Sequence, residues 1–235
     1  MFILRNTLIT NRLWLSAFKT VKLYTPHVLA NNKNNNMKKI IQLVLGGARS
    51  GKSTYAEAAA YQLYSDRKIA STTGQATAAK LIYLATATAG DAEMSERIDH
   101  HKQRRNEDWQ LIEEQLDIAN IVRAASSDTT ILIDCLTLWL SNCLYKGVWL
   151  TQRNALIEAL KTSNANIVMV SNEVGSGIVP MGELSRQFVD ESGWLHQQIA
   201  SIADKVDLIV AGLPLSLKDS CTTPIKTDSD RLNRS

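Results

Sequence analysis

The sequence predicts an α/β fold in which helices flank a mostly parallel central sheet. Short runs rich in Ile, Leu and Val alternate with longer amphipathic runs, a pattern typical of parallel sheets covered by helices. The apolar runs contain little polar alternation, as expected of strands that are buried on both faces. A glycine-rich phosphate-binding motif lies between the first apolar run and the first helical run, where such a loop is expected.

Each element is expected at a definite position in the chain. The sequence predicts strands at residues 39–45, 81–85, 130–134, 166–171 and 206–211. It predicts helices at residues 52–64, 91–105, 136–144, 151–161 and 182–204, and Gly193 marks a candidate break in the last of them. Residues 65–80 are rich in Ser, Thr and Ala, so an exposed loop is expected there.

The charge is distributed unevenly along the chain. The formal net charge is +3, yet residues 1–36 hold five basic residues and no acid, which leaves 21 bases and 23 acids in the remainder. That remainder has a net charge of −2. A nucleic-acid-binding domain would concentrate excess Lys and Arg on its folded part, so no nucleic-acid partner is expected.

The two ends of the chain are expected to lie outside the working domain, residues 37–218. Residues 1–36 are apolar, basic and acid-free and end in NNKNNN; they fit a transit peptide, a secretory signal or translation upstream of a true start at Met37. We favour the last interpretation and expect this extension to be disordered or a misassigned start. Residues 219–235 are polar and aperiodic, which predicts a disordered tail.

The composition indicates where in the cell the protein is expected to be located. Hydrophobic residues make up 45% of the chain and charged residues 21%, which is ordinary for a globular protein and argues against a membrane bundle. No apolar run reaches the ~18 residues that a membrane span requires, so stable membrane insertion is not expected. Cys135, Cys143 and Cys221 lack paired or metal-ligand spacing, which favours a reducing, cytoplasmic location.

The phosphate-binding motif is the strongest functional signal. The string GGARSGKS matches the P-loop pattern, follows an apolar strand and begins a helical run, so a P-loop NTPase fold is expected. Glycines let backbone N–H groups surround phosphate oxygens, and the helix N-terminus adds a favourable dipole. Lys52 is expected to reach the β and γ phosphates, and Ser53 to bind Mg²⁺. The nucleotide-binding residues of this loop are Gly46, Gly47, Ala48, Arg49, Ser50, Gly51, Lys52 and Ser53.

Two carboxylates follow predicted strands. Asp134 ends the run TILID, and Glu173 follows NIVMVSN. Ligands of open α/β sheets bind at the carboxyl edge of the strands, so either acid could complete a metal site. We assign Asp134, together with Ser53, as the predicted metal ligands.

Two adjacent histidines lie in the helix predicted at residues 91–105. At 100° per residue, Met94 and Ile98 define its inward stripe, and His101 falls about 20° from Met94 while His100 faces a more polar flank. An inward histidine can be a packing residue, but Lys102, Arg104 and Arg105 follow it and could bind phosphates. A neutral imidazole is also a competent nucleophile toward phosphorus. The residues alone do not choose among these roles.

The motifs taken together resemble a known family. They are GGARSGKS, YLATATAGDAEMSERIDHHKQRR, Trp109, Glu113, IDCLTLWLSN, VSNEVGSGIVP and VDLIVAGLPLSLK. In this order they resemble the bifunctional adenosylcobinamide kinase/adenosylcobinamide-phosphate guanylyltransferase family over residues 37–218. The basic extension and the long connection at residues 65–80 depart from the family pattern.

The resemblance implies a cobalamin biosynthesis enzyme. It would phosphorylate adenosylcobinamide with ATP or GTP, and then transfer GMP from GTP to adenosylcobinamide phosphate with release of pyrophosphate. It also implies a homotrimer of RecA-like subunits and a guanylyl-histidine intermediate at His101, which would make His101 and Lys52 catalytic. Further nucleotide-binding residues that it implies are Thr86, Ala87, Thr88, Lys102, Gln103, Arg104, Arg105, Glu113 and Asp134. Residues 174–186 form a weaker candidate for a mobile loop facing the corrinoid.

Two other functions remain open from the residues. A small-molecule P-loop kinase without guanylyl transfer would use His101 only as a structural residue. A GTP-binding switch protein would bind GTP and hydrolyse it slowly, but it has no evident need for the HHKQRR segment.

Overall fold

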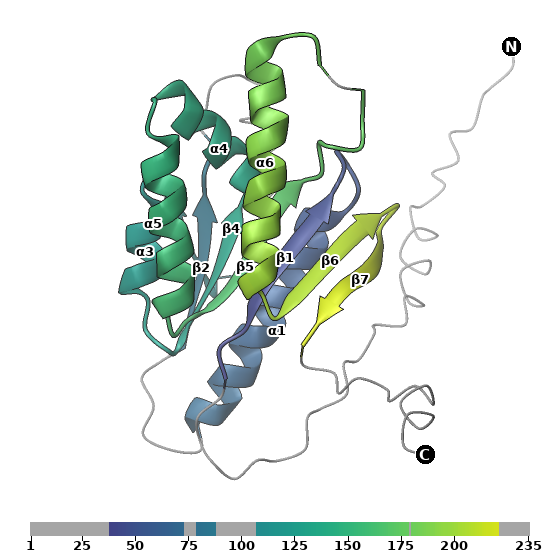
Figure 1. The fold of residues 1–235 in the computed structure, drawn as a ribbon. Helices are drawn as coiled ribbons and strands as arrows, with labels where there is room; N and C mark the ends of the chain where they lie inside the picture. Colours follow the sequence, from purple (N-terminus) through teal and green to yellow (C-terminus); the bar gives the residue numbers. More distant parts are fainter. Residues whose placement is uncertain (1–37, 73–78, 88–106, 179, 221–235) are drawn as a thin grey trace, which may run out of the picture. The chain divides into compact units, whose positions relative to one another are not determined.

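A seven-stranded, mostly parallel sheet forms the centre of the fold (Figure 1). The computed structural model describes residues 38–72, 79–87, 107–178 and 180–220. The strands are β1 (Ile41–Gly46), β2 (Lys80–Ala85), β3 (Trp109–Glu113), β4 (Thr129–Asp134), β5 (Asn166–Asn172), β6 (Lys205–Val210) and β7 (Leu213–Asp219), in the spatial order β3-β2-β4-β5-β1-β6-β7. Every neighbouring pair is parallel except β6 and β7. The predicted α/β class is therefore confirmed.

Helices cover both faces of this sheet (Figure 1). They are α1 (Lys52–Thr72), α3 (Ile118–Ala124), α4 (Leu136–Tyr145), α5 (Trp149–Thr162) and α6 (Glu183–Ile202). Apolar side chains of α1 pack in one core cluster with one face of β1, β2, β4 and β5, and those of α3 to α6 pack in a second cluster on the other face. Burial on both faces explains why the central strands lack polar alternation. None of the described helices is both long and apolar enough to span a membrane.

Two local predictions were wrong. Residues 65–80 were expected to form a loop, but α1 continues to Thr72. Its second half is held by Arg67, a buried side chain whose guanidinium donates to the carbonyl oxygen of Ser127 and to Oδ1 of Asn166. Helix α6 also runs unbroken through Gly193, because the helix buries Leu195 and neighbouring residues against the sheet and packing outweighs the low helix propensity of one glycine.

Three elements were not predicted at all: β3, α3 and β7. Strands β3 and β7 lie at the two edges of the sheet and are largely exposed, so neither forms a continuous apolar run. Helix α3 spans a single short segment, and Asp117 caps its N-terminus by accepting from the backbone N–H of Asn120. Strand β7 reaches Asp219, one residue beyond the predicted domain limit. The predicted helix at residues 91–105, the extension at 1–36 and most of the tail lie outside the described residues.

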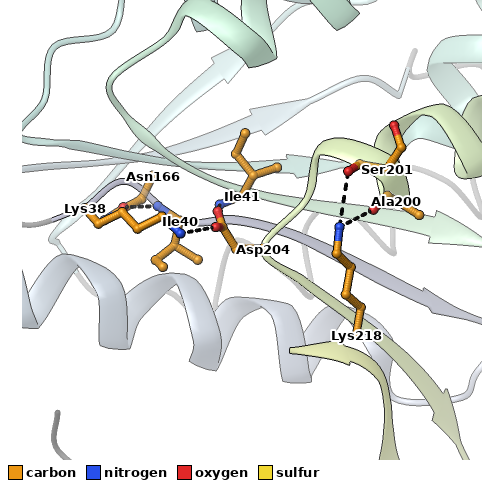
Figure 2. A network of polar contacts seen from close by, with 8 residues as sticks. All are labelled: Lys38, Ile40, Ile41, Asn166, Ala200, Ser201, Asp204 and Lys218. Carbon is orange, nitrogen blue, oxygen red and sulfur yellow. Dashed lines mark hydrogen bonds and ion pairs between the residues drawn. The ribbon is translucent and has the colours of Figure 1, made fainter. Parts of the chain in front are cut away.

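Polar contacts fasten the edge of the sheet where β1 begins (Figure 2). The carboxylate of Asp204, just after α6, accepts from the ammonium of Lys38 at 2.7 Å and from the backbone N–H of Ile41 at 3.0 Å. Lys218 of β7 donates to the carbonyl oxygens of Ala200 and Ser201 at 2.8 and 3.2 Å. A cation at these last carbonyls satisfies the C-terminus of α6. The contacts at this edge thus stabilise the fold. Ligands are expected at the opposite edge, where the parallel strands have their carboxyl ends.

Candidate nucleotide site

The P-loop leaves the carboxyl end of β1 and leads directly into α1. Strand β1 ends at Gly46 and α1 begins at Lys52. A Cβ atom at Gly46 would lie 2.5 Å from Oγ of Ser50 and 2.7 Å from the carbonyl oxygen of Ile209, so only glycine fits there. Gly51 has a φ of 93°, which glycine adopts without the steric cost that other residues bear. The two glycines therefore allow the tight loop that the motif predicts.

Two backbone hydrogen bonds attach this loop to the neighbouring strands. The N–H of Glu173, after β5, donates to the carbonyl oxygen of Gly46 at 3.1 Å, and the N–H of Gly212, in the β6–β7 turn, donates to that of Ser50 at 2.8 Å. The ammonium of Lys52 lies back over the loop and donates to the carbonyl oxygen of Gly47 at 3.2 Å. The ammonium group of Lys52 is therefore positioned at the loop that the motif predicts to bind phosphate.

Asp134 ends β4 at the same edge of the sheet. Strand β5 lies between β4 and β1, so the Asp134 strand is two inter-strand spacings, roughly 10 Å, from the P-loop strand. The hydroxyl of Tyr83 donates to Oδ2 of Asp134 at 2.8 Å, which orients the carboxylate. Among the described residues no hydrogen bond to Oδ1 is observed. The Asp134 carboxylate and the half-buried Ser53 hydroxyl are the hard oxygen ligands that Mg²⁺ prefers, so this donor set fits the metal.

Glu173, the second candidate carboxylate, is engaged by its own loop. Its Oε1 accepts from the backbone N–H of Gly175 at 2.6 Å and from the hydroxyl of Ser176 at 3.2 Å. Glu173 therefore stabilises the turn after β5, while its backbone N–H supports the P-loop at Gly46.

Thr86 and Cys135 join the ends of β2 and β4. The buried hydroxyl of Thr86 donates to the carbonyl oxygen of Cys135 at 2.7 Å and accepts from its N–H at 2.9 Å. Burial, reinforced by the charge of Asp134, raises the pKa of the Cys135 thiol to about 11. Cys135 is thus a protonated thiol at neutral pH and no candidate nucleophile. Ala87 follows at the same edge and is half-buried.

Other predicted site residues are not brought to the P-loop by the described structure. Glu113 ends β3, and β2, β4 and β5 lie between β3 and β1, a separation of four spacings or roughly 19 Å. The remaining predicted residues lie outside the described residues; they are Thr88, His101, Lys102, Gln103, Arg104 and Arg105. Their roles stay predictions.

The structure adds three residues to the site that the sequence did not single out. They are Tyr83, which orients Asp134; Gly212, which holds the P-loop; and Asn172, which ends β5 opposite Gly46. Asn172 had a readable signal, because it is a polar residue at the carboxyl end of a buried strand, as Asp134 is. Tyr83 lies inside an apolar run and Gly212 lies in an unpredicted turn. The sequence therefore contains no local pattern that marks either residue as part of the site.

A P-loop at the carboxyl edge of a mostly parallel sheet, followed by a carboxylate two strands away, defines a P-loop nucleotide-binding enzyme of the α/β class. The chain belongs to the family described as cobinamide kinase / cobinamide phosphate guanyltransferase, whose model matches residues 42–217. The matched region includes the P-loop, Asp134 and the adjacent His100 and His101.

Characterised relatives agree with this assignment. The chain is 46% identical over 184 residues to the bifunctional adenosylcobalamin biosynthesis protein CobP of Pseudomonas aeruginosa, covering 75% of this chain and 96% of that protein. It is 34% identical over 193 residues to the bifunctional adenosylcobalamin biosynthesis protein CobU of Escherichia coli, covering 75% and 98% of the two chains. The corresponding protein of Salmonella typhimurium is 35% identical over the same length and coverage.

Similarity to solved structures is distant. The P4 protein of bacteriophage phi6 in complex with ADP matches with a TM-score of 0.34 at 12% identity, covering 82% of this chain and 61% of that one. A KaiC-like protein from Pyrococcus horikoshii matches with a TM-score of 0.35 at 16% identity, covering 73% and 71%. The fold assignment therefore rests on the sheet order and the P-loop of this chain.

Proposed function

We propose that this enzyme phosphorylates adenosylcobinamide with ATP or GTP and then transfers GMP from GTP to adenosylcobinamide phosphate. The products of the second reaction are adenosylcobinamide-GDP and pyrophosphate. The observation that carries the proposal is the family match, which runs from β1 to β7 without leaving out an element of the nucleotide site. The P-loop supplies the phosphate site that both reactions require.

The guanylyl transfer is proposed to proceed through His101. A neutral imidazole nitrogen attacks the α-phosphorus of GTP, the bond from that phosphorus to the bridging oxygen breaks, and pyrophosphate leaves. A phosphate oxygen of adenosylcobinamide phosphate then attacks the same phosphorus and releases the imidazole. Two displacements let a bulky acceptor enter after pyrophosphate has departed. Thr88, Lys102, Gln103, Arg104 and Arg105 are proposed to bind the nucleotide near this histidine.

The P-loop is proposed to hold the triphosphate through its backbone N–H groups and Lys52, with the oxygens of Ser53 and Asp134 as the protein ligands of Mg²⁺. When bound, the metal would neutralise negative charge on the phosphates. The Tyr83 hydrogen bond to Asp134 supports this proposal, because it fixes the direction of the carboxylate.

A corrinoid-facing surface is proposed at the loop between β5 and α6. Ile178 and Met181 are each 97% exposed, and Leu184 is exposed as well. Large apolar side chains standing free beside a nucleotide site suit a bulky ligand with apolar edges. The loop begins at Glu173, whose N–H contacts the P-loop, so a ligand there would be close to the phosphates.

A homotrimer in the cytoplasm is proposed as the working form. The described surface supports self-association at β7, where Leu213, Leu215 and Leu217 are 72%, 56% and 56% exposed. An edge strand that displays apolar side chains is a site where another chain can pack.

The proposal is tested with purified enzyme, adenosylcobinamide, Mg²⁺ and GTP radiolabelled on either the α- or the γ-phosphate. We expect γ-label in adenosylcobinamide phosphate, α-label in adenosylcobinamide-GDP, and an acid-labile α-labelled protein adduct. The adduct should be lost in His101→Ala and retained in the neighbouring His100→Ala. Transfer of γ-label alone would identify a kinase without guanylyl transfer, and GTP hydrolysis without any corrinoid product would identify a switch protein.

A further inference from the structure

Strand β6 carries a buried carboxylate that takes no part in the nucleotide chemistry described above. Asp207 is only 6% exposed, although Val206, Leu208 and Ile209 surround it in the strand. Side chains alternate between the two faces of a strand, and Ile209 packs in the core cluster that includes α1. The side chain of Asp207 therefore lies on the α1 face of the sheet, under the helix that follows the P-loop.

Two side chains donate to this carboxylate, one from the neighbouring strand and one from the helix. Nε2 of Gln42, in β1, donates to Oδ2 of Asp207 at 2.7 Å. Tyr55, in the first turn of α1, forms a side-chain hydrogen bond with the same carboxylate. An ionised carboxylate only accepts, so the phenol is the donor. Asp207 thus joins strands β1 and β6 to the beginning of α1.

The buried charge of Asp207 lowers the stability of the fold at neutral pH. Burial raises the pKa of this carboxyl group, and the charge of Asp219 on β7 adds to the effect. The hydrogen bonds from Gln42 and Tyr55 and the charge of Lys205 oppose it only in part. An acid whose pKa is raised by folding destabilises the folded state once it is ionised. An apolar side chain would pack here without that cost, so we looked for a role of Asp207 other than stabilising the sheet.

Strand β6 is already in contact with the P-loop at two points. The carbonyl oxygen of Ile209 lies close to Gly46, since a Cβ atom on that glycine would be 2.7 Å from it. The backbone N–H of Gly212, just after β6, donates to the carbonyl oxygen of Ser50 at 2.8 Å. The loop is therefore fixed to β6 at both of its ends before α1 begins.

Tyr55 extends this attachment into the helix itself. Its backbone N–H donates to the carbonyl oxygen of Gly51 at 3.1 Å, which closes the first turn of α1, and its side chain is bonded to Asp207. The same turn carries Lys52 and Ser53, which are proposed above to meet the phosphates and Mg²⁺. The position of this turn therefore decides where those two side chains stand.

We propose that Asp207 is a positioning residue for the nucleotide site: by accepting the hydrogen bond of Tyr55, it holds the first turn of α1 where Lys52 and Ser53 meet the phosphates. Small displacements of a binding group weaken contacts that depend on geometry, so a turn that is fixed in advance binds nucleotide more tightly. Asp207 and Tyr55 act without touching the nucleotide. The proposal rests on the phosphate site proposed above.

The test measures the affinity of the full-length protein for a fluorescent GTP analogue in the presence of Mg²⁺. Tyr55→Phe removes only the hydroxyl and should weaken binding about fivefold. Asp207→Val removes the acceptor and should weaken binding to a similar extent. Because both variants break the same hydrogen bond, the double variant should bind no more weakly than either single variant. Additive losses, or unchanged affinity in Tyr55→Phe, overturn the proposal.

Asp207→Asn separates positioning from stability. It removes the buried charge but keeps an oxygen that can accept from Tyr55. At neutral pH its thermal midpoint should exceed that of the wild type, because the cost of the buried charge is gone, while its affinity for the GTP analogue should stay close to the wild-type value. A loss of affinity as large as that of Asp207→Val would show that the hydrogen bond to Tyr55 is not what acts on the site, and the proposal would be wrong.

Tyr61→Phe is the matched control. The hydroxyl of Tyr61 also donates from α1 to a carboxylate, Oδ2 of Asp108, at 3.0 Å, but Tyr61 lies six residues beyond Tyr55, about 9 Å further from the P-loop along the helix. This variant should bind the GTP analogue as the wild type does. If it weakens binding as Tyr55→Phe does, the effect reports the stability of the helix and the proposal is wrong. Since no corrinoid is present, failure of the proposed group transfers would not alter these affinities.

Discussion

The backbone N–H of Gly212 donates to the carbonyl oxygen of Ser50 at 2.8 Å. The turn of the β6–β7 hairpin is thereby joined to the P-loop, although the two segments are about 160 residues apart in the sequence. Both turn residues, Ala211 and Gly212, have positive φ angles of 52° and 79°, which is the geometry of the tight two-residue hairpin that suits twisted strands. Antiparallel β7 is therefore a support for the nucleotide site as well as an edge strand.

We expect Gly212→Ala to weaken nucleotide binding. A side chain at a φ of 79° destabilises the turn by about 1 kcal/mol, and relaxation of the turn would loosen its bond to Ser50. Gly147 is the matched control, because it also has a positive φ, 68°, and no group of the described residues lies within 4 Å of the place that a Cβ would take. Both variants should lose similar thermal stability, and calorimetry should show weaker GTP binding only for Gly212→Ala. Equal GTP affinities in the two variants would contradict the support role.

His196 predicts how stability depends on pH. Burial lowers its pKa from the ordinary value of 6.5, and the charge of Glu173 opposes this only in part. The unfolded chain therefore binds a proton at this site more readily than the folded one, and stability is lost as pH falls through about 6.5. Urea unfolding between about pH 5 and pH 8 should show a smaller decline at low pH for His196→Gln than for the wild type. Parallel declines would show that other groups dominate acid destabilisation.

Tyr83→Phe removes the hydrogen bond that orients Asp134. Because the aromatic ring remains, the loss of folding stability should be about 1 kcal/mol. The Mg²⁺ concentration that half-saturates GTP binding should rise severalfold, because the carboxylate is no longer held toward its proposed ligand. Tyr64→Phe is the control, since Tyr64 also donates to a carboxylate, Asp108, but on α1 away from the P-loop. A similar Mg²⁺ requirement in both variants would argue against Asp134 as a metal ligand.

Leu215→Lys tests the proposed self-association through β7. A charge in the middle of this exposed apolar strand should disrupt a subunit contact there, because a buried unpaired charge is costly. Light scattering after gel filtration should show a trimer for the wild type and smaller species for the variant. Tyr145→Lys serves as the control, since Tyr145 is an exposed aromatic residue on α4 and its replacement should leave the trimer intact. A trimeric Leu215→Lys protein would place the interface elsewhere.

The parts of the fold that the sequence predicted are those with strong local patterns. The central strands were readable because burial on both faces requires uninterrupted Val, Ile and Leu, and the P-loop because its glycines and Lys52 occupy fixed positions between strand and helix. Strand β7 was missed because Pro214 falls within its run, and a proline argues against a regular strand. The second half of α1 was missed because Arg67 stabilises it through distant partners that no local pattern reveals.

The same limit applied to the site. Asp134 could be predicted from its place at the end of an apolar run. The contribution of Gly212, by contrast, depends on a hairpin that folds back to Ser50. Such properties arise from tertiary structure, and a single sequence carries no periodic sign of them.

Helix α1 carries the P-loop at one end and the Arg67 anchor near the other. Arg67 lies fifteen residues beyond Lys52, a distance of about 22 Å along the helix axis. Its buried guanidinium bonds to the segment before β4 and to the start of β5, so tilting of the helix would break these contacts and expose a charge to an apolar layer. The contacts of Arg67 thus anchor the end of α1 that is remote from the P-loop. We therefore expect adjustment to a bound nucleotide to occur in the short loop of residues 46–51 rather than by a tilt of α1.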